Sequence, residues 1–547
     1  MNSAVLPQDT WQQHVNSAVL KFLKTAVVID NQPYVDSSAA SLLEPSLDSG
    51  LSDDVEVLTY PDVEGSSQDI HNLNIRNITD AFINEGIACA FVLPDDNAED
   101  DPANIRRALN ASKVSDLMVI DWYLKDTDSS LTLRILEQVA RSDSEEKGRL
   151  RLVCVYTGQP LNDQIFNDVL TSFRNGGIEL QPSDCGNYCA SAQNTLLVLL
   201  NKSETSVIDL PRELIKYFAR LADGLVPSFA LAAVGAVRKN VHHFVTRFSR
   251  TLDSAYIANR LLTNPPGDVT ELMRELLVAE FDNAIGIEKV ADEYLDVSPI
   301  QNWIHKNATV ISTQDNGAHP INSEFLLKLL DSCLEDKGFK DSDGQLIRLD
   351  DKKRERVSIA IAGTQDASRS SQDEFSRLVL FKREAYSLSG ANLDAGWRPS
   401  LTTGSLLRGS NGKYYVCFTP ACDTLRLTAP SSFVFLEAAI AQEKYNVILK
   451  DVEGNNLSLR FDRKRPNLST FVFLPDITQR VRAQPVPGHH TFVFNTEDQS
   501  ERFTWLGELR YGRATSEMAQ IVSNWMRIGI NDSEYLRLIS AGKINPF

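Results

Sequence analysis

The chain has 547 residues, a formal net charge of −18, 42% hydrophobic and 23% charged residues. This length predicts two to four domains, and the composition is that of an ordinary globular protein rather than a disordered or fibrous one. The start of the chain lacks a basic region followed by an apolar run, and the longest apolar stretch, residues 225–237, is too short to cross a bilayer. We therefore expect a cytoplasmic protein without a membrane partner.

The negative charge is concentrated in the first part of the chain. Residues 1–224 contain 34 acidic and 17 basic residues, whereas the remainder is close to neutral. Binding to nucleic acid requires a basic surface that neutralises phosphates. Nor does the remainder contain a convincing helix-turn-helix, so we expect no nucleic-acid partner.

Residues 20–222 alternate short apolar runs with amphipathic stretches. The apolar runs are continuous, as in strands buried on both faces, and predict strands at 26–29, 88–93, 117–120, 152–156 and 196–200. The amphipathic stretches predict helices at 75–84, 104–110, 130–139, 163–174 and 211–221. This alternation predicts an α/β fold with a doubly wound, five-stranded parallel sheet. Residues 32–73 and 176–194 exceed this unit and are interpreted as insertions.

The remainder divides into a helical linker domain, residues 225–300, and an α+β domain of unknown role, residues 301–547. In the linker, Asp268 is a candidate helix cap, with Glu271 three residues on as in a capping box. The C-terminal domain is strand-rich. Its predicted strands are 414–418, 424–427, 433–436, 445–449, 457–461, 471–474 and 491–494, followed by a helix at 516–527.

Four polar side chains follow or end the predicted parallel strands. They are Asp30, Asp121, Thr157 and Lys202, and the small residue Gly158 follows the threonine. The carboxyl ends of parallel strands share one edge of the sheet, where ligands bind. A carboxylate can act as a nucleophile towards phosphorus, a second acid helps to hold Mg²⁺, and a hydroxyl and an ammonium can bind phosphoryl oxygens.

This order of residues resembles the receiver domain of two-component response regulators, which has a flavodoxin-like fold. The resemblance covers residues 20–222. It implies that Asp121 accepts a phosphoryl group from a histidine kinase. It further implies that Asp30, Asp121 and the backbone carbonyl of Tyr123 bind Mg²⁺, and that Thr157 and Lys202 bind the phosphoryl oxygens.

The chain departs from the receiver pattern near the proposed site. Asn31 replaces the second of two adjacent acids, which weakens the expected Mg²⁺ site. Tyr123 and Gln159 occupy positions that control the access of hydrolytic water. Leu199 replaces the usual switch aromatic and Ser203 the usual proline, so we expect the customary output face to be used differently.

The cysteines offer two further hypotheses. Cys185 with Cys189, and Cys417 with Cys422, could each form half of a metal site, but neither pair has the second pair of ligands that zinc requires. Cys422 and Asp423 are expected just past a strand end. A nucleophilic cysteine would need a nearby base, and a plain tight turn is the alternative interpretation.

The enlarged receiver also resembles that of Detocs, a two-component phage-defence system. The resemblance is to its receiver protein without an effector domain, and it implies a phosphate sink whose partners are a histidine kinase and a second response regulator of the same operon. On this hypothesis the chain is not an enzyme. Two alternatives stay open: a receiver-regulated enzyme with its catalytic site in residues 301–547, and a pseudo-receiver that serves only for docking.

Overall fold

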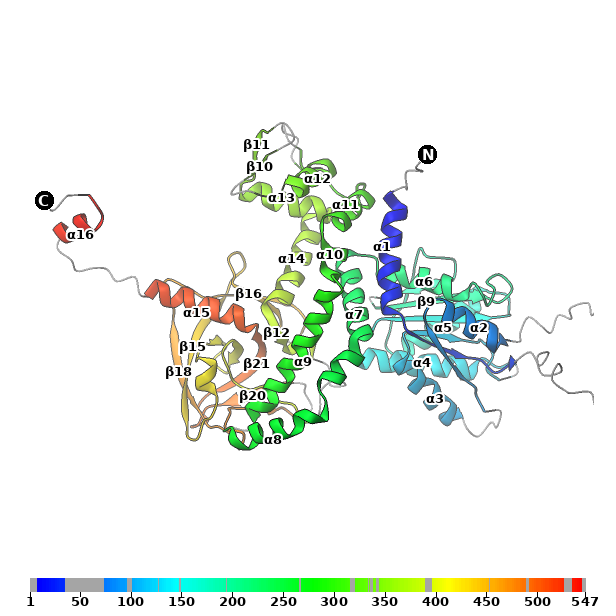
Figure 1. Ribbon diagram of the computed structural model, residues 1–547, viewed down its shortest axis with the longest axis horizontal. Helices are drawn as coiled ribbons and strands as arrows, with labels where there is room; N and C mark the ends of the chain where they lie inside the picture. Colours follow the sequence, from blue (N-terminus) through cyan, green and yellow to red (C-terminus); the bar gives the residue numbers. More distant parts are fainter. Residues whose placement is uncertain are drawn as a thin grey trace, which may run out of the picture. The chain divides into compact units, whose positions relative to one another are not determined.

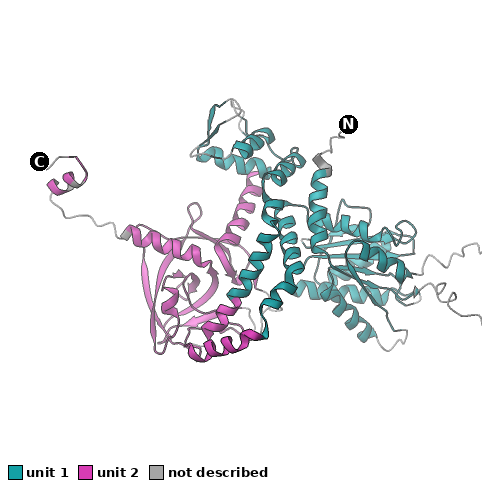
Figure 2. Ribbon diagram, viewed as in Figure 1, with its two compact units in different colours: residues 1–250, 275–363 teal, residues 251–274, 364–547 magenta. Residues whose placement is uncertain are grey.

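The computed structural model of the chain forms two compact units (Figures 1 and 2). Unit 1 comprises residues 1–250 and 275–363, and unit 2 comprises residues 251–274 and 364–547. These bounds differ from those of the three predicted domains. The structure describes residues 7–34, 73–95, 101–125, 127–146, 149–192, 194–264, 267–314, 320–332, 334, 338–340, 344–388, 396–451, 453–487, 491–525 and 534–543.

The centre of unit 1 is a seven-stranded sheet with the order β4-β1-β5-β6-β9-β8-β7. Its first five strands are parallel to one another, and β8 and β7 are antiparallel additions at the β9 edge. The strands are β1 (Thr25–Ile29), β4 (Ala88–Val92), β5 (Leu117–Ile120), β6 (Arg151–Thr157), β7 (Gln181–Pro182), β8 (Cys189–Ser191) and β9 (Thr195–Asn201).

Helices cover both faces of this sheet and form two separate hydrophobic cores. One face packs on α2 (Ile75–Asn84) and α6 (Leu210–Leu221), and the other on α3 (Asp101–Val114), α4 (Ser130–Glu146) and α5 (Asp163–Asn175). Successive strand residues enter opposite cores, as Ala26 and Val27 do. Burial on both faces thus explains the continuous apolar runs of β1, β5, β6 and β9, whereas the edge strand β4 is only partly buried.

The predicted parallel sheet is confirmed, but its strand count is wrong. The insertion at 176–194 contributes β7 and β8, whose short and polar sequences carry no periodic signal. The insertion at 32–73 falls largely outside the described residues. Its ends form a two-stranded parallel pair, β2 (Pro33–Tyr34) with β3 (Leu73–Asn74).

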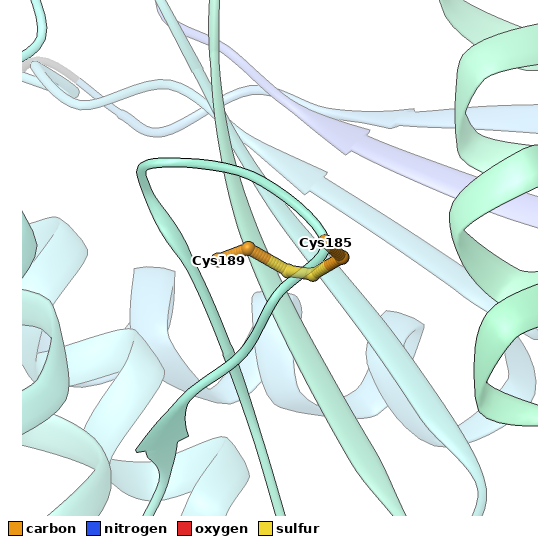
Figure 3. Close-up of a disulfide and its surroundings, with 2 residues drawn as sticks. All are labelled: Cys185 and Cys189. Atoms are coloured by element: carbon orange, nitrogen blue, oxygen red, sulfur yellow. A yellow bond between two sulfur atoms is a disulfide. The ribbon is translucent and has the colours of Figure 1, made fainter.

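The inserted hairpin carries a disulfide between Cys185 and Cys189 (Figure 3). In the disulfide form neither sulfur is a thiolate, so only the reduced pair could offer the half metal site considered from its spacing. Cys189 begins β8, next to Val198 of β9, so the disulfide ties the loop before β8 to the edge of the sheet.

A layer of helices completes unit 1. The N-terminal α1 (Pro7–Phe22), which the strand and helix pattern did not predict, buries Trp11 and Val15 in the same core as α2 and α6. Its Ser17 hydroxyl is 3.0 Å from that of Tyr294 in α10. The remaining elements of this unit are α7 (Leu225–Arg247), α10 (Val290–Leu295), α11 (Val297–Lys306), α12 (Ser323–Ser332), α13 (Asp351–Ala362), and the strand pair β10 (Gly338–Lys340) and β11 (Leu346–Arg348).

Two boundaries between the units fall within elements of secondary structure, near residues 250 and 274. The short 3-10 helix η3 (Arg250–Leu252) precedes α8 (Asp253–Leu262), and α9 (Gly267–Ile287) begins in unit 2 and ends in unit 1. The predicted capping box is wrong. Helix α9 already begins at Gly267, and the carboxylates of Asp268 and Glu271 instead form ion pairs with Arg480.

Unit 2 is built on a ten-stranded antiparallel sheet, whose main path is β16-β17-β15-β14-β13-β21-β20-β19, with β12 on β21 and β18 on β15. Its strands are β12 (Phe381–Glu384), β13 (Ser405–Gly409), β14 (Tyr414–Cys417), β15 (Ser431–Ile440), β16 (Val447–Lys450), β17 (Asn456–Arg460), β18 (Leu468–Phe473), β19 (Gln484–Pro485), β20 (Phe492–Asn495) and β21 (Arg502–Leu509). Its other elements are α14 (Gln365–Leu380), η4 (Ala385–Ser387), η6 (Ala421–Thr424), α15 (Tyr511–Trp525) and α16 (Glu534–Ser540).

Six of the seven strands expected in the C-terminal region are present. The predicted strand 424–427 is wrong: η6 ends at Thr424, and Arg426 has a left-handed backbone with φ of 59°. The sheet separates two cores, one of which is rich in aromatic rings such as Phe435, Phe503 and Trp505. In the part of the chain that the structure describes, no helix is both long and apolar enough to span a membrane.

Candidate functional site at the carboxyl edge of the parallel sheet

Four neighbouring parallel strands bring the predicted site residues to one edge. Asp30 follows β1, Asp121 follows β5, Thr157 is the last residue of β6, and Lys202 follows β9. The backbone N–H of Asp121 donates to the Ile29 carbonyl over 2.9 Å. Strand pairing therefore continues to the residues that carry the functional groups, and this fixes their spacing.

The ammonium of Lys202 lies between the two carboxylates. Its Nζ is 2.9 Å from Asp30 Oδ2 and 3.0 Å from Asp121 Oδ1. The Asp30 and Lys202 side chains are only 3% and 5% exposed, whereas that of Asp121 is 12% exposed. Of the three charged groups, Asp121 is therefore the most accessible to a reacting molecule.

The protonation of this group reflects its burial. Burial raises the pKa of Asp121 to about 6, helped by the charge of Asp30, and the ammonium of Lys202 only partly offsets this rise. Burial lowers the pKa of Lys202, but the attraction of Asp121 and Asp30 outweighs it, so the net shift is upward. Lys202 therefore stays charged at neutral pH, and Asp121 is largely ionised there and able to act as a nucleophile.

The donor set fits a hard divalent cation. The second oxygen of each carboxylate accepts a backbone N–H, from Gln32 to Asp30 over 2.8 Å and from Tyr123 to Asp121 over 3.1 Å. With their other oxygens both carboxylates contact Lys202, and carboxylate and carbonyl oxygens are the ligands that Mg²⁺ prefers. Among the described residues, no three His, Cys, Asp or Glu side chains cluster for a metal, so a third protein ligand would have to be of another kind, such as a backbone carbonyl.

Thr157 lies at the same edge, but its hydroxyl does not contact either acid. The hydroxyl accepts the backbone N–H of Gln159 over 3.1 Å, and the Thr157 carbonyl accepts the N–H of Lys202 over 2.8 Å. Since a hydroxyl can donate while it accepts, its hydrogen is available to an incoming anion. The structure thus brings together Asp30, Asp121 and Lys202, with Thr157 attached through the backbone of Lys202.

Two residues that sequence reasoning missed support the site. The Thr132 hydroxyl in α4 donates to the carbonyl of Asp121 over 3.0 Å, and the ring of Tyr156 lies 5.8 Å from the Lys202 ammonium. The Tyr156 hydroxyl in turn donates to the Thr205 carbonyl over 2.7 Å. Both residues lie in segments whose apolar periodicity dominates, so their pattern predicts burial and gives no functional signal.

Two of the departures from the receiver pattern, Leu199 and Ser203, lie in or just after strand β9. Leu199 is buried in the core, and its N–H donates to the carbonyl of Tyr188 in the inserted hairpin over 3.0 Å. The hairpin therefore covers the edge of β9. The surface beside α5, β9 and α6 is therefore partly formed by the inserted hairpin, which a five-stranded sheet lacks.

The cysteine hypothesis for unit 2 finds little support. Cys422 lies in η6, exposed, with its Sγ 3.3 Å from Asp423 Oδ1. Within the described part of the chain, no histidine contacts it. Its partner in the possible half metal site, Cys417, is buried in β14, and burial raises the pKa of that thiol to about 12. A thiol that resists ionisation in this way is a poor metal ligand and a poor nucleophile.

Residues 22–207 match the model of the response receiver domain family, which agrees with the parallel sheet and its acidic edge. The match covers about a third of the chain, and it indicates a receiver domain in this segment, which suggests a role in two-component signalling. No curated protein and no solved structure matches the chain.

Proposed function

We propose that the chain accepts a phosphoryl group on Asp121 from a histidine kinase and holds it as a phosphate sink. The observation that supports phosphoryl transfer is the convergence of three charged side chains at the carboxyl edge of the parallel sheet: Lys202 Nζ lies 2.9 Å from Asp30 and 3.0 Å from Asp121. A nucleophilic carboxylate, a second acid and a fixed cation are the groups that phosphoryl transfer to an aspartate requires.

In the proposed step, a carboxylate oxygen of Asp121 attacks the phosphorus of the phosphohistidine. The new O–P bond forms as the P–N bond breaks, and the imidazole leaves with the electron pair. Lys202 already contacts Asp121, so its ammonium can move to a phosphoryl oxygen without leaving the site. Thr157 can donate its hydroxyl hydrogen to a second oxygen.

Mg²⁺ would neutralise the phosphoryl oxygens during transfer. Asp30, Asp121 and the backbone carbonyl of Tyr123 would hold it. The contact that the structure has from Tyr123 is its N–H on Asp121, so the carbonyl is proposed from the receiver resemblance. Asn31 cannot supply a second negative charge next to Asp30, and we expect a weaker Mg²⁺ affinity than two adjacent acids would give.

The sink role in a Detocs-like phage-defence system rests on resemblance to its receiver protein without an effector. Its partners would be a histidine kinase and a second response regulator. The bulky Tyr123, two residues after Asp121, would shield the acyl phosphate from water and lengthen its lifetime. We place this exchange in the cytoplasm, where the Cys185–Cys189 disulfide would be reduced.

The test is the intact mass of the full chain after incubation with Mg²⁺ and acetyl phosphate or a purified kinase. Wild type should gain one phosphate, and Asp121→Ala should gain none. Asp128→Ala, which changes an exposed acid in the following loop, serves as the matched control. A phosphate that persists for hours and can return to the kinase supports a sink. Absence of the adduct from wild type with both donors leaves a docking pseudo-receiver.

A further inference from the structure

Unit 2 contains a cavity that the receiver function does not use. It has a volume of about 660 Å³ and lies between α8, the first turns of α9, and the loop before β19. Its charged lining comprises four arginines, Arg260, Arg274, Arg480 and Arg482, and a single acid, Glu271. In a chain with a net charge of −18, this local excess of positive charge is not part of a general basic surface.

Ion pairs on one side give the cavity a fixed frame. Arg480 contacts Asp268 and Glu271, each over 3.1 Å, and both acids lie in the first turns of α9. Arg426 contacts Asp268 over 3.2 Å, and Arg274 contacts Glu271 over 2.9 Å. Two carboxylates are thus shared among three arginines, which leaves positive charge uncompensated within the frame.

Arg260 and Arg482 are not part of this frame. Both are half-buried, and neither forms an ion pair with any described residue. The best contact of the Arg482 guanidinium is a long one, 3.5 Å to the carbonyl of Arg398. A guanidinium that is partly withdrawn from water usually has an anionic or carbonyl partner. Because neither of these two has a strong one, both side chains are available to bind a ligand.

The backbone beside the cavity is strained. Gln479 lines it and has φ of 57°, and Arg426 has φ of 59°. The two strained residues are linked, because the N–H of Leu427 donates to the Gln479 carbonyl over 3.0 Å. Left-handed conformations of residues other than glycine cost about 1 kcal/mol or more and concentrate at functional sites.

The side chain of Gln479 adds a separate indication of a ligand. Its Oε1 is buried and has no hydrogen-bond partner. An unsatisfied buried amide is costly, and a glutamine can present either its oxygen or its NH₂ group by rotating the terminal amide. Gln479 is one of the residues that line the cavity, next to Arg480 in the chain, and its unpartnered amide is therefore at the margin of the proposed site.

We propose that this cavity binds a small ligand that bears a phosphate or pyrophosphate group. The volume suits a small molecule. Arginine forks bind phosphate in a bidentate manner, and the N-terminal end of the long helix α9 adds a partial positive charge. A nucleic acid would require an extended basic face rather than one compact cluster. This inference is independent of phosphoryl transfer to Asp121.

The experiment is calorimetric titration of pyrophosphate, and separately of ATP, into the full chain in a buffer containing a chelator. The test variants are Arg260→Gln and Arg482→Gln. The matched control is Arg408→Gln, which removes an exposed arginine of β13 outside the cavity lining. Each test variant should weaken binding by about ten-fold or more, since charge-assisted hydrogen bonds are lost, whereas the control should match wild type. Arg482→Lys should bind with intermediate affinity because it keeps the charge and loses the fork.

Two further measurements keep the outcomes distinct. Asp121→Asn should bind pyrophosphate as wild type does, which separates this cavity from the receiver site. Melting temperatures of the arginine variants that equal that of wild type without ligand show that these variants fold. The proposal is overturned if wild type binds neither probe, if Arg408→Gln weakens binding as much as the test variants do, or if only Asp121→Asn weakens it.

Discussion

The protonation of Asp121 links the site to the stability of the folded protein. Its pKa in the folded protein is about 6, above its ordinary value of 3.8, so the folded state binds this proton more tightly than the unfolded chain. By linkage, the free energy of unfolding falls as pH rises from about 4 to about 6, and the loss persists above that range. Ionised Asp121 therefore destabilises the metal-free protein at neutral pH.

Asp121→Asn should accordingly raise the free energy of unfolding at pH 7.5 by about 1 to 3 kcal/mol, since one pKa unit corresponds to about 1.4 kcal/mol. The gain should shrink towards zero below pH 4, where wild type is also protonated. Urea denaturation at several pH values, with a chelator present, measures it. A variant that is less stable than wild type at pH 7.5 would show that the ion pair with Lys202 outweighs burial.

The second residue is Lys202, the shared cation of the site. Lys202→Met leaves Asp30 and Asp121 buried without a counter-charge, and breaking a buried pair in this way costs about 3 to 5 kcal/mol. Adding Asp121→Asn should recover part of the loss, because only one acid then lacks a partner. Urea denaturation of the single and double variants gives the coupling energy. Strictly additive effects would mean that Lys202 does not hold the two acids together.

At the scale of single elements, helix α1 depends on a close contact with α7. A Cβ at Gly235 of α7 would lie 2.5 Å from the carbonyl oxygen of Lys21 in α1. Since backbone cannot move aside cheaply, Gly235→Ala should destabilise the protein by about 1 to 3 kcal/mol. Gly286→Ala in α9 meets no atom within 4 Å and is the matched control. Thermal denaturation should show a lower melting temperature only for Gly235→Ala.

The inserted hairpin offers a second prediction at this scale. The Cys185–Cys189 disulfide closes a short loop, and loop-closure entropy gives it a stabilising effect of about 2 kcal/mol. Cys185→Ser should therefore lower the melting temperature in oxidising buffer and match wild type in excess reductant. Cys422→Ser, at an exposed free cysteine, should have no effect in either buffer. A difference that survives reduction would trace the effect to packing of Cys185 instead.

These elements show what the sequence could and could not predict. Four of the five parallel strands were predictable because burial on both faces leaves continuous apolar runs, whereas the edge strand β4 is only partly buried. Strand ends then identify Asp30, Asp121 and Lys202. Strands β7 and β8 were not predictable, since a two- or three-residue strand has no period. Asp268 and Glu271 carry the spacing of a capping box, yet they pair with Arg480, which lies about 200 residues away in the chain. Local patterns contain no information on such distant partners.

The two-unit organisation could not be predicted for the same reason: it depends on contacts between segments that are far apart in the chain. Sequence patterns place a boundary where helices follow the last parallel strand, near residue 222. In the structure the core beneath α2 and α6 continues through α1, α7 and α10, with Trp11, Ala232 and Tyr294 among its buried members. The receiver domain therefore shares one hydrophobic core with helices that lie outside the matched residues 22–207.

A shared core predicts how fragments behave. A fragment of residues 20–222 would lose α1, α7 and α10 and expose the apolar surface that they cover, including Phe218 and Leu214 of α6. A fragment of residues 1–363 keeps that core intact. Because burial of apolar surface is the main stabilising contribution to folding, the longer fragment should unfold in a cooperative transition, and the shorter one should aggregate or unfold well below it. Circular dichroism during heating, with size-exclusion chromatography at 20 °C, compares the two. If residues 20–222 are monomeric and as stable as residues 1–363, the receiver domain is an independent folding unit and its helical neighbours contribute nothing to its stability.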